Sequence, residues 1–274
     1  MSNIKRTTIA TMLVTLLLLV GLISTARTAD DQVGKVLECM RKNVPNELRA
    51  QDVEFTTADK AGTASTLKGR LFAAREQTPD GSRHVRAMLM VSSPPNLAGA
   101  AYLVREKDGD AKDGMYVYLP SVRRVRRVTG SIADGGLMGT SFSYADFKQI
   151  QNTFTGAQTA YESAGEVDQR AVHVLTFKPT EAGAGGYSLV RSWVDQKTCV
   201  PLKAEFYENR TVRKRLVTPA SSLKQVGDFW YPAIIEMHDL SDGLRTTLKV
   251  KAVTPDPEPG LSAGTFDPKT FFQR

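Results

Sequence analysis

The stretch from Met115 to Phe147, MYVYLPSVRRVRRVTGSIADGGLMGTSFSYADF, joins more fixed charge to more aromatic side chains than any other part of the chain. It begins as a strand with aromatic residues at alternate positions, then turns into a doubled arginine repeat. A glycine-rich loop follows, and a serine then starts a short helical turn. Two interpretations are open: a rim or latch over an apolar cavity, or an edge strand with solvated arginines.

The arginine repeat, if it is a strand, places arginines on both of its faces. This pattern predicts an exposed edge strand and not a buried one. The guanidinium groups could pair with Asp134 or Asp146, or could contact phosphate or carboxylate head groups or a membrane partner. The residues predicted to make contacts at the rim are Arg123, Arg124, Arg126, Arg127 and Asp146.

The segment from Val122 to Phe147 is predicted to be a mobile rim, because its glycines allow conformations that a packed strand does not need. These glycines are Gly130, Gly135, Gly136 and Gly139. Phe142, Tyr144 and Phe147 follow the loop. We expect these aromatic side chains to fold inward over an empty cavity, so that cargo must displace them.

The N-terminus has the pattern of a secretory signal peptide. Lys5 and Arg6 precede an uncharged apolar run, and small residues then allow cleavage after Ala26 or Ala29. The apolar run is shorter than the ~20 residues of a spanning helix, which makes an uncleaved anchor the weaker alternative. No cysteine follows the run directly, so lipidation is not expected. We therefore predict a signal peptide at residues 1–26, one domain at residues 27–274, and export to the periplasm.

The net charge of the chain indicates its binding partner, and its two cysteines indicate a disulfide. Removing Lys5 and Arg6 lowers the formal charge from +7 to +5, and a basic exported protein meets anionic lipid more readily than nucleic acid. Cys39 and Cys199 are the only cysteines, and an oxidising compartment predicts a disulfide between them. Two buried free thiols are the alternative.

The rest of the chain is dominated by alternating apolar and polar residues, which predict strands joined by hairpins. A helix is expected only near Asp31–Val44, where apolar residues recur at helical spacing. About ten antiparallel strands form a sheet large enough to curl and to enclose a cavity that a helix can cover. The fold class predicted is therefore mainly β, a curled antiparallel sheet forming an incomplete β-barrel with a few covering helices.

Motifs for catalysis are weak. There is no Gly-x-Ser-x-Gly nucleophile motif, and no lysine follows the glycines that end at Gly139 as a phosphate-binding loop requires. Two cysteines and three scattered histidines are too few for a metal site. We predict no cofactor and no enzymatic activity, with a hydrolase of lipids or cell-wall esters kept as a remote alternative.

Several motifs together resemble the outer membrane lipoprotein-sorting protein family, the LolA-like group often found beside exporters of the RND type. They are Tyr118–Pro120 with the arginine run, Gly139–Phe147, Cys39–Pro45, Asn96–Leu103, and Trp193–Lys203. The resemblance covers nearly all of the chain after residue 26. It implies the LolA/LolB fold and the carriage of a lipid, or of lipoprotein acyl chains, across the periplasm towards the outer membrane. An accessory subunit of an RND-type inner-membrane exporter that carries nothing is the alternative.

The cavity of such a carrier is predicted to be lined by apolar residues from several strands. This prediction depends on the register of each strand, because a shift of one residue turns every side chain to the other face. The residues predicted to line it, besides the aromatic residues of the loop, are Leu89, Tyr102, Tyr116, Tyr118, Trp193, Phe206 and Ile235.

Overall fold

The computed structural model describes residues 30–46, 49–78, 80–107, 113–150, 157–179, 186–254 and 263–273. The predicted signal peptide lies outside these residues. Among the helices of the described part, none is long and apolar enough to cross a membrane.

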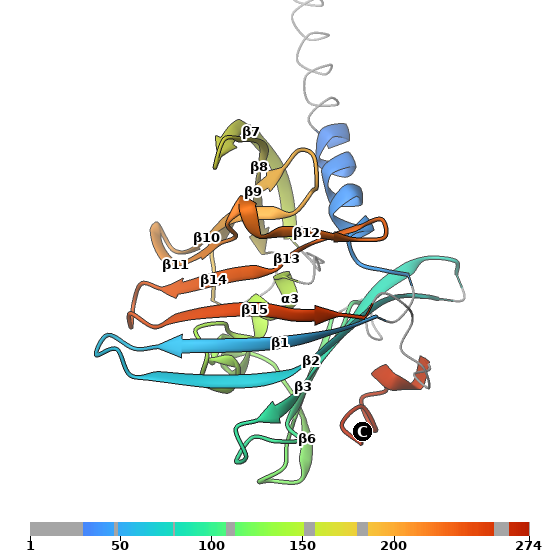
Figure 1. The fold of residues 1–274 in the computed structure, drawn as a ribbon. Coiled ribbons are helices and arrows are strands. Elements are labelled where there is room, and N and C mark those ends of the chain that lie inside the picture. The colour runs from blue at the N-terminus through green and yellow to red at the C-terminus, as the bar shows by residue number, and fades with distance from the viewer. Residues whose placement is uncertain are drawn as a thin grey trace, which may run out of the picture.

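One antiparallel sheet of thirteen strands forms the body of the molecule (Figure 1). Its edge strands, β6 and β7, lie at opposite ends of the strand order, so the sheet is not closed. This confirms the predicted fold class of a curled sheet and an incomplete barrel. In order across the sheet, the strands are β6 (Arg124–Arg127), β5 (Gly114–Leu119), β4 (Ala101–Arg105), β3 (Arg83–Ser93), β2 (Ala64–Gln77), β1 (Arg49–Ala58), β15 (Arg245–Val253), β14 (Ile234–Asp239), β11 (Thr211–Val217), β10 (Pro201–Glu208), β9 (Leu189–Asp195), β8 (Arg170–Pro179) and β7 (Ala157–Val167).

Most neighbouring strands are hairpins, as alternating sequence and short turns predict. Two pairings are different: β1 with β15 joins segments far apart in the chain, and β11 with β14 has β12 and β13 between its strands in sequence. β7 was not predicted from the sequence: it is an edge strand with few buried positions, so its apolar alternation is weak.

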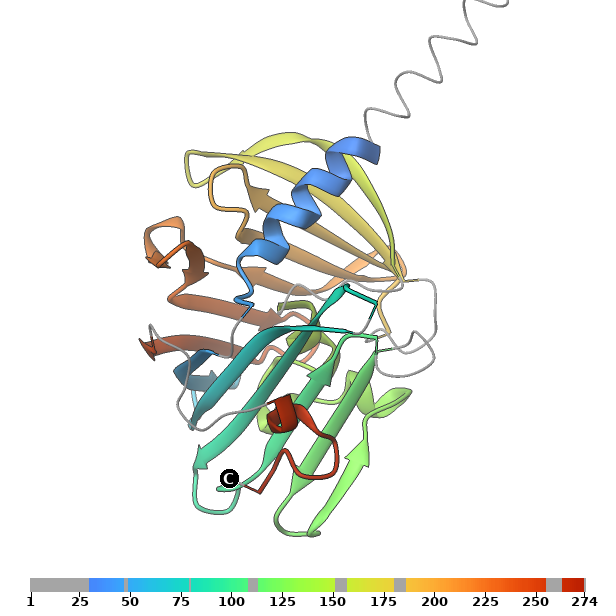
Figure 2. The ribbon, with the colours of Figure 1, turned by 90° about the vertical axis from the view of Figure 1, so that its right-hand side faces the viewer.

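The inner face of the sheet carries the main hydrophobic core. Strand residues such as Phe55, Leu89 and Phe206 form one cluster with Met40 of the N-terminal helix (residues 30–42). The same cluster includes side chains of the connection between β6 and β7, which contains α2 (Ser131–Asp134), η1 (Leu137–Gly139) and α3 (Tyr144–Ile150). Figure 2 shows the blue helix of residues 30–42 crossing in front of the yellow strands.

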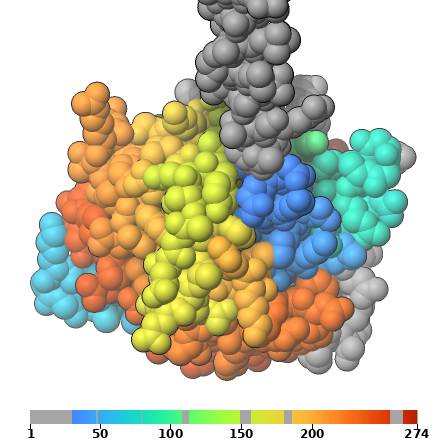
Figure 3. Space-filling view, turned by 90° about the horizontal axis from the view of Figure 1, so that it is seen from above, coloured from blue at the N-terminus to red at the C-terminus, as the bar shows by residue number. Residues whose placement is uncertain are grey.

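The outer face is covered by the C-terminal segment. The C-terminal segment with η3 (Ala263–Phe266) packs Phe266 and Phe271 against Phe72, Met88 and Leu103. A second, two-stranded sheet of β12 (Leu223–Val226) and β13 (Phe229–Pro232) follows η2 (Ala220–Ser222). From above, the blue helix of residues 30–42 is flanked by the yellow-green strand β7 and the teal end of the β2–β3 hairpin (Figure 3).

Candidate functional site: an apolar pocket beneath the β12–β13 hairpin

A pocket of about 150 Å³ opens from the inner face of the sheet. Its floor is made by inner-face side chains of the central strands, and its walls by the end of the N-terminal helix, by the segment at Cys199 and by the β12–β13 hairpin. Most of these side chains are apolar, with Asn43, Arg49, Gln51 and Thr218 as polar exceptions, so the pocket favours a largely apolar ligand. The floor residues are Val53, Leu71, Ala73, Leu216, Ile235, Leu248 and Val250.

The β12–β13 hairpin forms the wall that faces solvent. A two-residue turn joins its strands, and Gly227 takes the positive φ of 56° that the first position of such a turn requires. Phe229, Trp230 and Tyr231 line the pocket, yet each side chain is only half-buried. Burial raises the pKa of the Tyr231 hydroxyl above its usual range. These residues leave part of an aromatic surface in contact with water.

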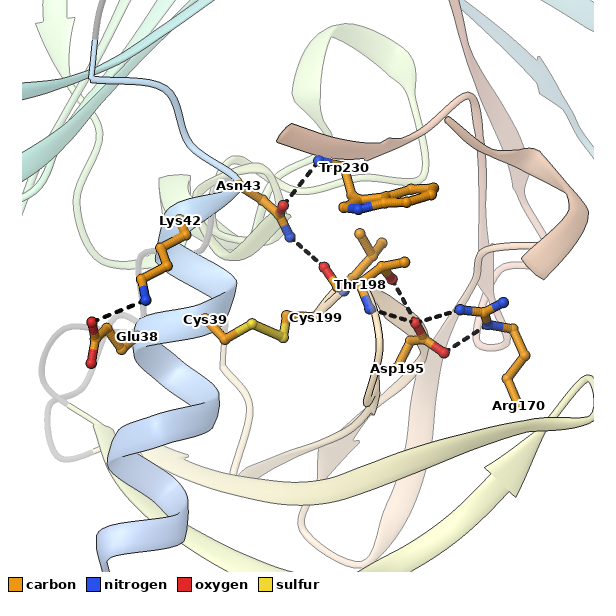
Figure 4. The surroundings of a disulfide bond; sticks show 10 residues. Glu38, Cys39, Lys42, Asn43, Arg170, Asp195, Thr198, Cys199 and Trp230 are labelled. Carbon is orange, nitrogen blue, oxygen red and sulfur yellow. Dashed lines mark hydrogen bonds and ion pairs between the residues drawn. A yellow bond between two sulfur atoms is a disulfide. The ribbon is translucent and has the colours of Figure 1, made fainter. Parts of the chain in front are cut away.

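The side chain of Asn43 connects this hairpin to the end of the N-terminal helix. Its Oδ1 accepts a hydrogen bond from the backbone N–H of Trp230 at 3.0 Å, and its Nδ2 donates one to the carbonyl of Thr198 at 2.8 Å (Figure 4). Asn43 itself lines the pocket. One amide therefore joins the helix, the hairpin and the segment at Cys199 around the same opening.

The disulfide between Cys39 and Cys199 is present, as predicted, and it ties the helix to the same segment (Figure 4). Arg170 donates two hydrogen bonds to the carboxylate of Asp195, which also accepts from the N–H and the hydroxyl of Thr198. Burial of Asp195 acts to raise its pKa, but the bonds from Arg170 and Thr198 outweigh burial and hold the pKa below its usual value. The segment at Cys199, which forms one wall of the pocket, is thus held by the disulfide and by the hydrogen bonds to Asp195.

Replacing both Cys39 and Cys199 with serine is expected to lower the free energy of unfolding by about 2–5 kcal/mol, because the disulfide closes a loop of 160 residues. Urea denaturation with and without reductant measures the loss. Reductant should destabilise the natural protein and leave the serine variant unchanged. Equal stability of the oxidised and reduced natural protein would show that the bridge does not brace the fold.

The structure places only one of the predicted cavity residues, Ile235, in the lining of this pocket. Leu89, Tyr102 and Phe206 lie on the inner face as expected, but they belong to the packed core elsewhere in the barrel.

Three predicted cavity residues lie on the outer face, because the register of their strands turns them away from the interior. Tyr116 and Tyr118 flank Val117, which is the inward residue of β5, and Tyr118 stacks on Phe272 at 3.9 Å. Trp193 also points outward, with the Lys203 ammonium 4.3 Å from its ring centroid. Aromatic size was a poor guide to the inner face, since the outer face is covered too.

The aromatic residues after the glycine-rich loop are folded into the barrel. Phe142 packs edge-on against Phe55, with ring centroids 6.0 Å apart. Tyr144 and Phe147 both meet the ring of Tyr102, whose hydroxyl donates a hydrogen bond to the carbonyl of Tyr144 at 2.7 Å. Burial raises the pKa of Tyr102 well above its usual range. Their inward direction agrees with the prediction; their displacement by cargo stays a prediction.

Asp146 is not at the rim, and the prediction of a contact there is corrected: its side chain is fully buried. Its carboxylate accepts hydrogen bonds from Lys214 Nζ at 2.9 Å, from the Tyr187 hydroxyl at 2.8 Å and from the N–H of Ser143 at 2.7 Å. Lys214 Nζ also donates to the carbonyl of Ser141 and lies 3.7 Å from Asp239. A buried carboxylate needs such partners. Asp146 therefore pins the segment after the glycine-rich loop to β11.

The four arginines of the repeat lie at the edge of the sheet, in and beside β6. All of their side chains are exposed, as the edge-strand interpretation predicts. Among the described residues, no carboxylate forms an ion pair with Arg123, Arg124, Arg126 or Arg127, so the suggested pairs with Asp134 and Asp146 do not form. Asp134 instead lies near Arg213. Burial raises the pKa of the Asp134 carboxyl, and the charge of Arg213 acts to lower it.

Sequence reasoning missed most of the pocket, above all the hairpin residues. The run Phe229–Pro232 directly after Gly227-Asp228 was a usable signal, because four consecutive apolar residues behind a turn cannot all face a core. The floor residues gave no such signal, since each is an ordinary apolar position of a strand.

The fold and the pocket define a mainly β protein whose incomplete barrel holds an apolar site. A family model with the description "-like: Uncharacterized protein" matches residues 83–270, and the chain belongs to that family. A search of curated proteins found no match.

Solved structures share the fold. A DUF1329 family protein from Desulfovibrio piger is 20% identical with a TM-score of 0.74, over 85% of this chain and 95% of that one. A putative outer membrane lipoprotein-sorting protein domain from Vibrio parahaemolyticus is 22% identical with a TM-score of 0.73, over 88% and 97%. A LolA superfamily protein from Nitrosomonas europaea is 18% identical with a TM-score of 0.64, over 85% and 96%. The predicted resemblance to LolA-like proteins is thereby confirmed for the fold.

Proposed function

We propose that the protein is a periplasmic carrier that holds the acyl chain of a lipid or lipoprotein in the pocket beneath the β12–β13 hairpin. The observation that carries the proposal is the composition of this pocket: apolar strand residues form its floor, and half-buried aromatic residues form its outer wall. The putative lipoprotein-sorting domain from Vibrio parahaemolyticus, whose fold this chain shares, supports the choice of cargo.

Reversible binding is energetically reasonable. Each buried methylene contributes about 0.8 kcal/mol, so a few carbons of a chain suffice for weak binding and a longer chain binds more tightly. The pocket of about 150 Å³ is smaller than the roughly 300–1,000 Å³ of typical small-molecule sites. A complete acyl chain therefore needs more room than this pocket offers, and we infer that the β12–β13 hairpin moves outward to provide it.

Organic extraction of the purified full-length protein, followed by mass spectrometry, tests the proposal. A carrier should release acyl-chain lipid in a fixed ratio to protein, and delipidated protein should take up a fluorescent fatty acid. An accessory subunit of an RND-type exporter that carries nothing should do neither. Absence of lipid in the extract together with absence of uptake would remove the carrier function.

The exposed arginines of the sheet edge are proposed to make transient contact with an anionic membrane surface. Replacing Arg123, Arg124, Arg126 and Arg127 with glutamine should weaken binding to anionic liposomes by at least about tenfold and blunt its salt dependence, since a basic residue near such a surface contributes about 1 kcal/mol. Liposome sedimentation at several salt concentrations measures the effect. The free energy of unfolding should hardly change. Unchanged binding together with unfolding would identify the repeat as a purely structural strand.

A further inference from the structure

Three arginines, Arg41, Arg75 and Arg83, lie close to one another beyond the end of the apolar pocket and are not among its lining residues. Arg75 is two residues beyond Ala73 of the pocket floor on β2, so the two side chains share the inner face. Its strand partner Val85 is buried and lies on the same face of β3 as Ala87 of the inner core. Its backbone N–H donates to the carbonyl of Pro45, a pocket-lining residue, at 2.8 Å. Arg83 follows on β3 and Arg41 lies on the N-terminal helix.

Among the described residues, one carboxylate forms an ion pair with this group of three arginines. Arg41 pairs with Glu106 at 2.9 Å, and Glu106 is buried and also accepts the N–H of Val85. Within the described part of the chain, neither Arg75 nor Arg83 has an ion-pair partner. Burial, and then the charges of Arg83 and Arg41, lower the pKa of the Arg75 guanidinium.

Arg75 is moreover incompletely hydrogen-bonded. Its Nε atom is buried and, among the described residues, has no hydrogen-bond partner. Buried polar groups in native proteins are nearly always paired, so an unpaired guanidinium nitrogen next to two further arginines indicates a place for an anion. Figure 3 shows the teal end of the β2–β3 hairpin next to the blue helix of residues 30–42.

We propose that Arg75, assisted by Arg41 and Arg83, binds the carboxylate or phosphate head group of an anionic amphiphile whose acyl chain occupies the pocket. This inference rests on the proposed carrier function and names the ligand class for it. A guanidinium suits both head groups, because its planar array of donors matches two oxygens at once. The neighbouring apolar floor then binds the acyl chain of the ligand. The charged head group and the hydrocarbon chain of one ligand are thus bound by separate parts of the site.

The experiment compares ligands with the same chain and different heads. Radiolabelled palmitate, palmitoyl lysophosphatidate and uncharged hexadecanol are bound to the delipidated full-length protein, with inorganic phosphate as a competitor lacking a chain. Arg75→Gln should weaken binding of palmitate and lysophosphatidate by about ten- to a hundredfold and leave hexadecanol unchanged. Phosphate at millimolar concentration should compete weakly with the charged ligands only.

The matched control is Arg70→Gln. Arg70 lies on the same strand but on the opposite face, where it pairs with Asp52 at 3.0 Å, and its replacement should alter no affinity. An equal loss of charged and uncharged ligands in Arg75→Gln, or no loss at all, would overturn the head-group site while the carrier function stands. If no ligand binds the natural protein, the proposed function itself fails and the head-group site with it.

Discussion

Replacing Val250 with tryptophan is expected to reduce acyl-chain binding by a hundredfold or more. Val250 lines the pocket floor on β15 and is only half-buried, so an indole placed there fills the space that a chain would occupy. Several excluded methylene groups at about 0.8 kcal/mol each correspond to a loss of this size. Fluorescent fatty-acid uptake by delipidated protein measures it.

Ala252→Trp provides the control for this substitution. Ala252 is on the same strand and is exposed, so the added indole meets solvent and uptake should remain as in the natural protein. Thermal unfolding of both variants separates a blocked pocket from a damaged fold. Normal uptake by a folded Val250→Trp variant would mean that the ligand binds elsewhere in the barrel, for instance where Phe142 and Phe147 now pack.

Replacing Lys214 with methionine is expected to lower the free energy of unfolding by about 3–5 kcal/mol. The side chain is 3% exposed and its ammonium lies between the buried carboxylates of Asp146 and Asp239. Removing one partner of a buried ion pair leaves the other charge without compensation. Urea denaturation monitored by tryptophan fluorescence gives the change.

The double variant Lys214→Met with Asp146→Asn tests the origin of that loss. Asparagine keeps an acceptor for Tyr187 and removes the charge, so the double variant should be more stable than Lys214→Met alone. Lys35→Met is the surface control: Lys35 pairs with Asp31, but both side chains are about two-thirds exposed, at 67% and 65%, and stability should hardly change. A loss in Lys214→Met no larger than in Lys35→Met would show that the buried pair does not hold the segment in place.

The stretch from Met115 to Phe147 has two structural roles. Its first half is an exposed edge strand with arginines, as the pattern predicted. Its second half is an anchor: Ser141 donates to the carbonyl of Met237 and accepts the Lys214 ammonium at its own carbonyl, while Asp146 neutralises that ammonium. The residues Ser141, Ser143 and Asp146 therefore hold helix α3 inside the barrel, and their place in the motif follows from this role.

The sequence alone was sufficient to predict features that depend on residues near in the chain, and features for which few pairings are possible. Period-two alternation and short turns predicted most strands and their hairpin pairing, and both faces being apolar predicted a sheet covered on both sides. With two cysteines in a chain predicted to be exported, only one internal disulfide was possible, and Cys39–Cys199 is the pair observed. Arginines on both faces of one strand predicted the exposed edge at β6.

Tertiary structure alone decided which face of each strand became the interior. Alternation shows that the two faces of a strand differ, but it does not show which face turns inward. In β5, Val117 faces the inner core and the tyrosines face outward, where Phe272 stacks on Tyr118. The pocket has the same origin: β1 meets β15, and Asn43 meets Trp230 across a separation of 187 residues. Contacts between such distant segments leave no periodic trace in the sequence, because each residue's pattern reflects only its own strand.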